Sequence, residues 1–190
     1  LDPARFRQRL EITLERINLE LTRVFGRDPF AVDEIVARYA PAAERLVPFV
    51  KDTGLLIHRA LQRGENVLLE GAQATMLDID YGTYPYVTSS SPSAGGACQG
   101  AGIGPRHIQE VIGVVKVYTS RVGSGPFPTE LKDEVGDWIV AQGNEYGTTT
   151  GRRRRCGWID LVSLRYAARL NGFTGLALTR LDVLTGLNAI

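Results

Sequence analysis

The sequence contains few residues of the kinds that build cross-links and metal sites. Of its 190 residues, two are cysteines, Cys98 and Cys156, and two are histidines, His58 and His107. The cysteines stand far apart and form no Cys-x-x-Cys spacing, which argues against a redox pair or a zinc cluster. We predict free thiols in a reducing cytoplasm, with one structural disulfide as the alternative. The histidines have no acidic or cysteine partner nearby in sequence, and we expect ordinary surface or core positions for both.

Net charge and long apolar runs are also lacking. The 22 basic and 21 acidic residues leave a net charge of +1, so the chain as a whole has no general attraction for nucleic acid or membranes. No apolar run approaches the roughly 20 residues that would span a bilayer, and we expect no signal peptide. The chain begins with Leu-Asp-Pro rather than Met and ends on LTGLNAI, where a new segment starts. We therefore expect it to be the middle of a longer protein.

The glycine-rich segment 94–104, AGGACQGAGIG, lacks the spacing of a nucleotide-binding loop. It contains neither Gly-x-Gly-x-x-Gly nor the P-loop motif, and it has no lysine to meet a phosphate. We predict a flexible or tightly turned loop here. The chain also shows no Ser-His-Asp order and no nucleophile elbow, so a serine triad is not indicated.

Residues 1–65 have the pattern of a helical segment. Asp2 and Pro3 form a helix-start signature, and apolar residues then recur at spacings of three and four. Further helices are predicted at about 32–46 and 53–63. These helices carry no residues that suggest chemistry, so we expect them to pack against a core or against a partner subunit.

From residue 66 onward the sequence alternates between strand and helix patterns. Short apolar runs that end in loops predict strands at NVLLEG (66–71), GVVKVYTSRVG (113–123) and FTGLALTRLD (173–182). Helices are predicted between them, at about 105–111, 132–142 and 160–170. This alternation predicts an α/β fold for residues 66–190, with a mainly parallel sheet and flanking helices. Ligands of such sheets bind at the carboxyl ends of strands, where the unusual stretches of this chain lie.

The loop after the first predicted strand is rich in acids, amides and hydroxyls. Asp78 and Asp80 could ligate a metal together, but two carboxylates alone are a poor metal set, and turn stabilisation is the alternative. The Gln73 side chain can both donate to and accept from the edge of a base. Thr88 and the serines after it offer hydroxyl and N–H groups to an anion, or they form a plain serine-rich loop.

The stretch GTTTGRRRRCGW places four consecutive arginines among glycine, threonine and tryptophan residues. An RNA-binding or nuclear-import patch usually has more scattered basic residues with exposed aromatics. Arginine prefers planar, two-pronged partners such as carboxylate and phosphate, and threonine hydroxyls beside it add hydrogen bonds. We therefore favour the binding of a small anion over an RNA patch or a solvated charge run.

The tetrapeptide TRLD, residues 179–182, ends an apolar run. An aspartate two residues after a basic residue is similar to the element with which GTP-binding proteins recognise guanine. The carboxylate accepts hydrogen bonds from the guanine N1 and exocyclic amine, which adenine cannot supply. A helix-capping role for Asp182 is the alternative.

The chain resembles the adenylosuccinate synthetase family in four stretches that occur in series: LLEGAQATMLDIDYGTYPYVTSS, SRVGSGPFPTEL, GTTTGRRRRCGWIDLVSLRYA and NGFTGLALTRLDVL. The resemblance is strong from about Asn66 to Leu184 and looser over the first 65 residues. It implies a P-loop-NTPase-like architecture and a ligase that uses GTP to join L-aspartate to inosine monophosphate (IMP). GTP phosphorylates O6 of IMP, and the aspartate amine then displaces the phosphate at C6.

The resemblance also implies roles for individual residues. Gln73 would contact the hypoxanthine O6 and act as the catalytic residue. The IMP-binding residues would be Gln73, Thr88, Val122 and Arg152. The aspartate-binding residues would be Thr148, Thr149, Thr150, Arg152 and Arg154. The GTP-binding residues would be Arg154, Arg180, Leu181 and Asp182. Arg153 and Arg155 would face away from the ligands, into solvent or structural pairs.

Some features depart from the family pattern. The family usually has lysine where Arg180 stands, and its version of SSSPSAGG contains asparagine and threonine. The family's general base, phosphate-loop lysine, acid histidine and Mg²⁺ ligands have no counterpart here, so we expect no metal ligands in this chain and no activity from it alone. The complete enzyme would be a cytoplasmic homodimer without nucleic-acid or membrane partners. The alternative is a non-catalytic module that binds a purine nucleotide or RNA through the arginine loop.

Overall fold

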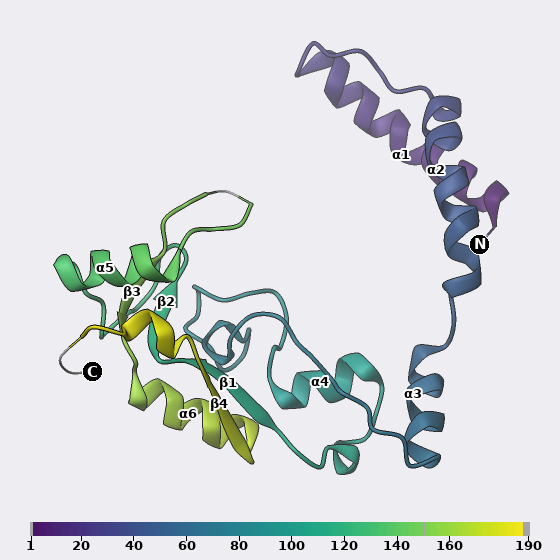
Figure 1. The fold of residues 1–190 in the computed structure, drawn as a ribbon. Helices are drawn as coiled ribbons and strands as arrows, with labels where there is room; N and C mark the ends of the chain where they lie inside the picture. Colours follow the sequence, from purple (N-terminus) through teal and green to yellow (C-terminus); the bar gives the residue numbers. More distant parts are fainter. Residues whose placement is uncertain (1, 150, 188–190) are drawn as a thin grey trace. The chain divides into compact units, whose positions relative to one another are not determined.

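The computed structural model describes residues 2–149 and 151–187 (Figure 1). They form two compact units, one on each side of the Asp52–Thr53 junction, and each is described by itself. The sequence-based boundary at residue 65, between a helical part and an α/β part, stays a prediction. Within the described ranges no helix is both long and apolar enough to cross a membrane.

The first unit contains three helical elements: α1 (Pro3–Arg23), α2 (Val32–Leu46) and the 3-10 helix η1 (Val47–Phe49). Asp2 caps α1, because its carboxylate accepts hydrogen bonds from the N–H groups of Ala4 and Arg5 at 3.0 and 3.1 Å. Asn18 of α1 holds the connection to α2: its amide donates to the Phe30 carbonyl oxygen, and its side-chain oxygen accepts from the Phe30 N–H. The helices predicted for this region are confirmed.

The second unit combines helices with two small sheets. Its helical elements are α3 (Thr53–Gln62), η2 (Thr75–Leu77), α4 (Ala94–Ala101), η3 (Pro105–His107), α5 (Glu134–Gly143), α6 (Leu161–Asn171) and η4 (Leu181–Leu184). Its strands are β1 (Ile112–Lys116), β2 (Tyr118–Arg121), β3 (Arg155–Trp158) and β4 (Gly175–Thr179). β1 and β4 lie side by side and pair in parallel, whereas β2 and β3 pair antiparallel (Figure 1). The predicted α/β fold class is thus confirmed.

Val117 divides the stretch for which the sequence predicts a single strand. Its N–H donates to the Thr179 carbonyl oxygen at 3.1 Å and so extends the pairing of β1 with β4. From Tyr118 the chain pairs with β3 instead, and Tyr118 lies opposite Trp158. The prediction of one continuous strand over 113–123 is wrong, because the stretch changes its pairing partner at this residue. The change places the carboxyl end of β1 directly before the start of β2.

Two further elements differ from the predictions. NVLLEG is not a strand: no described residue pairs with it, and Leu68 is 90% exposed. An apolar run becomes a strand only when a neighbouring strand takes up its backbone hydrogen bonds. The helix predicted at 105–111 is reduced to the single turn η3.

The glycine-rich segment forms helix α4 instead of the predicted loop. Ser93 caps its first turn by accepting a hydrogen bond from the Gly96 N–H at 3.3 Å, and Gly102 ends it in the left-handed conformation with φ of 67°. Gly96 is required by packing, because a Cβ there would lie 1.9 Å from the Ser91 carbonyl oxygen. Capping and close packing therefore outweigh the low helix propensity of glycine.

The core of the second unit lies between the β1–β2 junction, β3, α5 and η4. It consists of Val117, Tyr118, Ile139, Val140, Cys156, Val183 and Leu184. Burial raises the pKa of the Cys156 thiol to about 11, so the reactive thiolate is scarce at neutral pH. Cys98 and Cys156 are both free, which confirms the prediction of free thiols. This core supports the loops that follow β2, α5 and β4.

Gly157 of β3 offers a direct test of this packing. A Cβ at Gly157 would lie 2.0 Å from the Thr129 carbonyl oxygen, so the backbone must shift to accept alanine. We expect Gly157→Ala to lower the free energy of unfolding by about 2 kcal/mol or more, as overpacking a core does, when measured by urea unfolding. Gly71→Ala is the control, because no described atom lies within 4 Å of a Cβ built there. Equal stability of the two variants would contradict the close approach.

Candidate ligand-binding site

The run of arginines lies on a loop between α5 and β3, which we call the arginine hairpin (residues 145–155). Glu145 and Arg154 form its base, where the Arg154 N–H donates to the Glu145 carbonyl oxygen at 2.9 Å. One step further out, the Gly147 N–H donates to the Arg152 carbonyl oxygen at 2.8 Å. These bonds bring the two ends of the loop together.

The tip of the arginine hairpin carries most of the predicted aspartate-binding residues. Thr148, Thr149 and Arg152 are exposed there. Gly151 has a φ of 63°, a left-handed conformation that glycine adopts without strain and that lets the loop turn back. Thr150, also predicted to bind aspartate, lies outside the described residues.

Arg155 is held by structural partners. Its Nε and Nη2 donate to the two carboxylate oxygens of Glu130 at 2.7 and 2.6 Å. Its Nη1 donates to the carbonyl oxygens of Gly123 and Gly125 at 3.2 and 2.9 Å. This guanidinium therefore fastens the hairpin to the loop that follows β2.

Arg153 forms a pair of a different kind. It binds Asp137 of α5 at the surface, where the two side chains are 55% and 69% exposed. Exposed pairs of this kind contribute little to stability. The prediction that Arg153 and Arg155 enter structural pairs or face solvent is confirmed by these contacts.

Arg154 turns inward, onto the buried carboxylate of Glu145. The Glu145 side chain is 2% exposed, and its Oε2 accepts a hydrogen bond from Arg154 Nη1 at 3.1 Å. Its Oε1 accepts from Lys116 Nζ and from the Tyr118 hydroxyl, both at 2.5 Å. Burial alone would raise the pKa of Glu145, but the hydrogen bonds from Lys116 and Tyr118 and the nearby positive charges hold it below its usual range. Glu145 is therefore a buried carboxylate that is ionised at neutral pH.

Sequence reasoning assigned no role to Glu145, Lys116 or Tyr118. One signal was available, because a lone acid stands shortly before four arginines and a partly buried guanidinium needs a counter-charge. Lys116 and Tyr118 carry no such signal. They reach the hairpin only because tertiary folding places the β1–β2 junction against its base.

Arg180 stands next to the same network. Its backbone is left-handed, with φ of 66°, and its guanidinium donates to the Gly143 carbonyl oxygen at the end of α5. The Tyr118 hydroxyl is a second neighbour of this guanidinium. Burial, followed by the hydrogen bond to Glu145, raises the pKa of Tyr118 to about 12, so the phenol stays protonated. Arg180, and not Asp182, is the N-cap residue of η4, so the helix-capping alternative for Asp182 is not supported.

Gln73 lies in an exposed turn before η2, and its backbone is left-handed with φ of 68°. Non-glycine residues rarely adopt this conformation, and such strain is concentrated at functional sites. The amide of Asn171 in α6 donates to the Thr75 hydroxyl at 3.0 Å and so holds η2 in place. The contacts that position this end of the loop therefore come from α6 rather than from the arginine hairpin.

Asp78 is fully buried and stabilises the turn after η2. Its Oδ1 accepts from the N–H groups of Asp80 and Tyr81 at 2.9 and 3.1 Å, and its Oδ2 accepts from the Ser91 hydroxyl at 2.6 Å. Burial alone would raise the pKa of Asp78, but these hydrogen bonds hold it below its usual range. Because both oxygens are occupied, the turn-stabilising interpretation is favoured over a metal pair with Asp80.

Arg121, at the end of β2, joins the loop that carries Thr88 to the loop that carries Val122. Its Nη2 donates to the Thr83 hydroxyl and to the Tyr86 carbonyl oxygen, both at 3.1 Å. Thr88 is half-buried and Val122 is exposed. The two predicted IMP-binding positions are thus brought to one region, next to the carbonyl groups that anchor the arginine hairpin.

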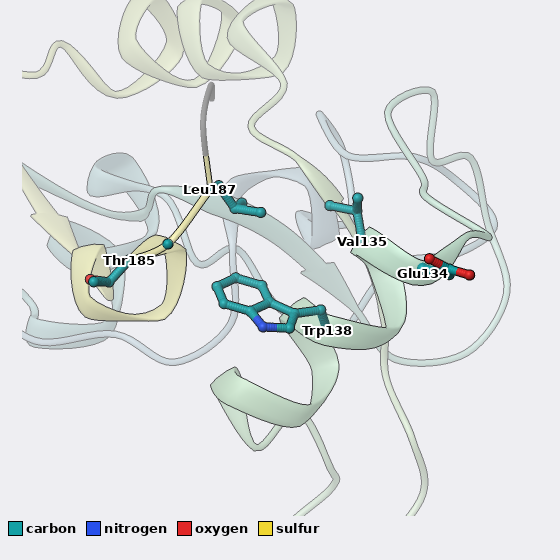
Figure 2. Close-up of a pocket in the computed structure, with 6 residues that line it drawn as sticks. Glu134, Val135, Trp138, Thr185 and Leu187 are labelled. Atoms are coloured by element: carbon teal, nitrogen blue, oxygen red, sulfur yellow. The ribbon is translucent and has the colours of Figure 1, made fainter.

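A pocket of about 470 Å³ lies between α5 and the segment after η4 (Figure 2). It is lined by Glu134, Val135, Trp138, Thr185, Gly186 and Leu187. In Figure 2 the Trp138 indole lies between α5 and the Thr185–Leu187 segment. None of the predicted ligand-binding residues lines this pocket, so it is distinct from the arginine hairpin.

The arrangement suits small anions better than a polyanion. Two cations, Lys116 and Arg154, face the single buried carboxylate of Glu145, so one positive charge at the hairpin base has no matching acid among the residues that the structure describes. Arg155 is held by Glu130 and so is poorly placed to follow a phosphate chain. Fold and loops together define an α/β protein whose loops present clustered guanidinium and hydroxyl groups.

The family follows from comparison with known proteins. A family model described as adenylosuccinate synthetase matches residues 1–190. The chain belongs to the adenylosuccinate synthetase family, and the resemblance drawn from its motifs is confirmed.

Individual relatives are longer than this chain. The adenylosuccinate synthetase of Thermobifida fusca is 58% identical over 189 residues, which is 100% of this chain and 44% of that protein. That of Caldanaerobacter subterraneus subsp. tengcongensis is 59% identical over 185 residues, or 97% of this chain and 43% of that protein. The structure of the fully ligated enzyme of Plasmodium falciparum matches with a TM-score of 0.86 at 39% identity, over 98% of this chain and 43% of that one. The chain therefore spans less than half the length of these relatives.

Asp78 allows a test of the buried turn through pH. Its pKa is lowered in the folded protein, so its contribution to stability is fully present above about pH 4, the ordinary range of aspartate, and is lost as the pH falls through the lower folded-state value. We expect Asp78→Asn to lower the free energy of unfolding by about 2 kcal/mol at pH 7. The free energy of unfolding of the variant should also fall less steeply as the pH is lowered. Urea unfolding at several pH values measures both effects.

Asp80→Asn is the matched control for this turn, because Asp80 stands two residues after Asp78 and is exposed. It should leave the stability at pH 7 nearly unchanged. An Asp78→Asn variant with the same pH dependence as the unsubstituted chain would contradict the assignment.

Proposed function

We propose that the chain forms the substrate-holding part of a GTP-dependent ligase that joins L-aspartate to IMP and produces adenylosuccinate, the step that commits IMP to AMP in purine biosynthesis. Family membership over the whole chain supports this proposal. The observation that carries it is the shared network at the hairpin base. Arg154 binds Glu145, Glu145 binds Tyr118, and Tyr118 neighbours Arg180, so the proposed aspartate and GTP positions adjoin.

The arginine hairpin would hold the aspartate substrate. Arg154 would bind a carboxylate of aspartate, since a guanidinium offers two parallel donors to a carboxylate. The hydroxyls of Thr148, Thr149 and Thr150 would complete the contacts from the tip. Arg152, exposed on the same tip, would face both aspartate and the IMP ribose.

IMP would lie along the loops that Arg121 joins. Thr88 would bind the 5′-phosphate, and the backbone of Val122 would contact the ribose. The Gln73 amide would donate to the hypoxanthine O6 and stabilise the 6-phosphoryl intermediate. The strained backbone of Gln73 supports a role that depends on the direction of its side chain.

The segment after β4 would bind GTP. The Asp182 carboxylate would accept hydrogen bonds from the guanine N1 and amine, with Leu181 beside it. Arg180 stands where the family usually has lysine, but its guanidinium is anchored on the Gly143 carbonyl oxygen. Its aliphatic stem would therefore be free to stack on guanine, as the stem of a lysine would.

The Mg²⁺ that the family implies does not fit the described residues. Among them no group of three or more histidines, cysteines and acids is close enough to hold a metal ion. Both oxygens of Asp78 accept hydrogen bonds within its own turn. The metal ligands of the proposed enzyme would therefore belong to other parts of it, and none of the roles above involves a metal. We also propose that the complete enzyme is a cytoplasmic homodimer.

The proposed activity can be tested in a chimera. Residues 1–190 would replace the matching segment of the full-length Thermobifida fusca relative, which is 58% identical to it. We expect the chimera to form adenylosuccinate only when IMP, aspartate and GTP are all present, as followed by absorbance. The chain alone should show no turnover, because general base and electrostatic contributions each supply a large part of the rate. A folded chimera without this activity would contradict the proposal.

The same chimera tests the role of Arg154. We expect Arg154→Leu to raise the KM for aspartate by roughly tenfold to a hundredfold, because a charge-assisted hydrogen bond to the substrate is lost. The KM for GTP should change far less. Arg153→Leu is the control, because Arg153 pairs with Asp137 at the surface. An aspartate KM that is unchanged in the Arg154 variant would rule out its assignment.

The alternative of an RNA-binding module is less well supported. Arg155 is held by Glu130 and by backbone carbonyl oxygens, which removes it from phosphate binding, and Arg154 turns inward onto Glu145. Binding of RNA with a steep loss of affinity at higher salt would favour this alternative.

A further inference from the structure

We infer that Glu145 is a positioning residue that sets the direction of Arg154 for the binding of aspartate. The inference rests on the proposed function, since it takes Arg154 as an aspartate-binding group. It adds a residue that lies below the ligand-binding surface and that would act only through Arg154.

Glu145 binds Arg154 at two points, the backbone N–H and the guanidinium. The Glu145 carbonyl oxygen accepts from the Arg154 N–H at 2.9 Å, and the Glu145 Oε2 accepts from Arg154 Nη1 at 3.1 Å. The first bond fixes the backbone from which the side chain starts. The second fixes the guanidinium at its other end. Together they limit the directions in which the guanidinium can point.

The Glu145 carboxylate is itself fixed by hydrogen bonds from two other residues. Lys116 and Tyr118 both donate to Glu145 Oε1, and Lys116 also donates to the Ser120 hydroxyl at 2.9 Å. Tyr118 is 1% exposed and belongs to the core of the second unit. Glu145 therefore cannot move without breaking contacts to β1 and β2, so it transmits the rigidity of the core to the hairpin.

The partly buried pair of Arg155 and Glu130 shows the contacts of a purely structural pair. Arg155 meets Glu130 with two nitrogens, and its third nitrogen binds two carbonyl oxygens. Arg154 meets Glu145 with one nitrogen, and its Nε is buried without a partner among the described residues. Buried donors are nearly always satisfied, so the unpartnered Nε shows that protein groups engage Arg154 less completely than Arg155. The charge balance agrees, because Lys116 already neutralises Glu145 and leaves Arg154 able to attract an anion.

The test uses Glu145→Gln in the chimera described above. Glutamine keeps the size of the side chain and can still accept one hydrogen bond, but it removes the charge that aligns the guanidinium. We expect the KM for aspartate to rise by about tenfold. The KM for IMP and the kcat should change by less than about threefold, since Glu145 would touch neither IMP nor the reacting atoms.

Asp137→Asn is the matched control, because it removes the acid that pairs with the neighbouring arginine of the same hairpin. It should leave the aspartate KM unchanged. A double variant, Glu145→Gln with Arg154→Lys, should raise the aspartate KM no further than Arg154→Lys alone, since one residue acts through the other. Additive effects, or an equal rise in all three KM values, would overturn the inference in favour of a general structural role.

Two further measurements cover the remaining outcomes. If Glu145→Gln does not fold, Tyr118→Phe removes one donor to Glu145 without a change of charge, and it should raise the aspartate KM by about threefold. An unchanged KM in that variant would overturn the inference. If the unsubstituted chimera is folded but inactive, the proposed function fails, and crystal structures of the chimera with and without Glu145→Gln decide the positioning role. An Arg154 guanidinium that keeps its place in the variant contradicts it.

Discussion

The arrangement of the loops depends on the hydrogen bonds and ion pairs that surround the buried carboxylate of Glu145. A buried charge is costly unless hydrogen bonds and opposite charges surround it, and here Lys116, Tyr118 and Arg154 supply them. These partners come from the end of β1, the start of β2 and the base of the arginine hairpin. The carboxylate therefore binds the hairpin to the strands, and through Tyr118 it adjoins Arg180, which begins η4. If the elements were displaced, the charge would be left without its partners.

Other guanidiniums connect the remaining loops in the same way. Arg155 fastens the hairpin to the loop after β2, and Arg121 fastens that loop to the segment before Thr88. Arginine suits this purpose because its planar group can donate to several carbonyl oxygens at once. Consecutive arginines of one run thus differ in their surroundings: Arg155 pairs with Glu130, Arg154 with the buried Glu145 and Arg153 with Asp137 at the surface, while Arg152 is exposed at the tip. This division is the structural basis of the proposal that the run binds a small dianion rather than a nucleic acid.

The helices were predictable wherever their ends carried their own signals. Asp2 caps α1 and Gly172 ends α6 in the left-handed conformation, so local sequence was enough for both. The strands were less predictable, because a strand depends on a partner that is remote in sequence. NVLLEG has the composition of a strand but no partner among the described residues, and the run through Val117 changes partner halfway. The prediction of a loop at the glycine-rich α4 failed for a related reason. The cap at Ser93 and the close approach at Gly96 outweigh the low helix propensity of glycine.

The candidate site shows the same division between local and tertiary information. The sequence by itself determined the family and the kinds of groups that the loops present: an amide at Gln73, hydroxyls and guanidiniums on the hairpin, and a carboxylate at Asp182. It did so because these residues lie in contiguous stretches whose order and spacing can be recognised. Only the tertiary structure decided which acid each guanidinium meets, Glu130 for Arg155 and Glu145 for Arg154. That choice depends on Glu130 and Glu145, whose distances to the arginines are set by strand pairing and by packing around Tyr118, and neither is encoded in any single stretch of the chain.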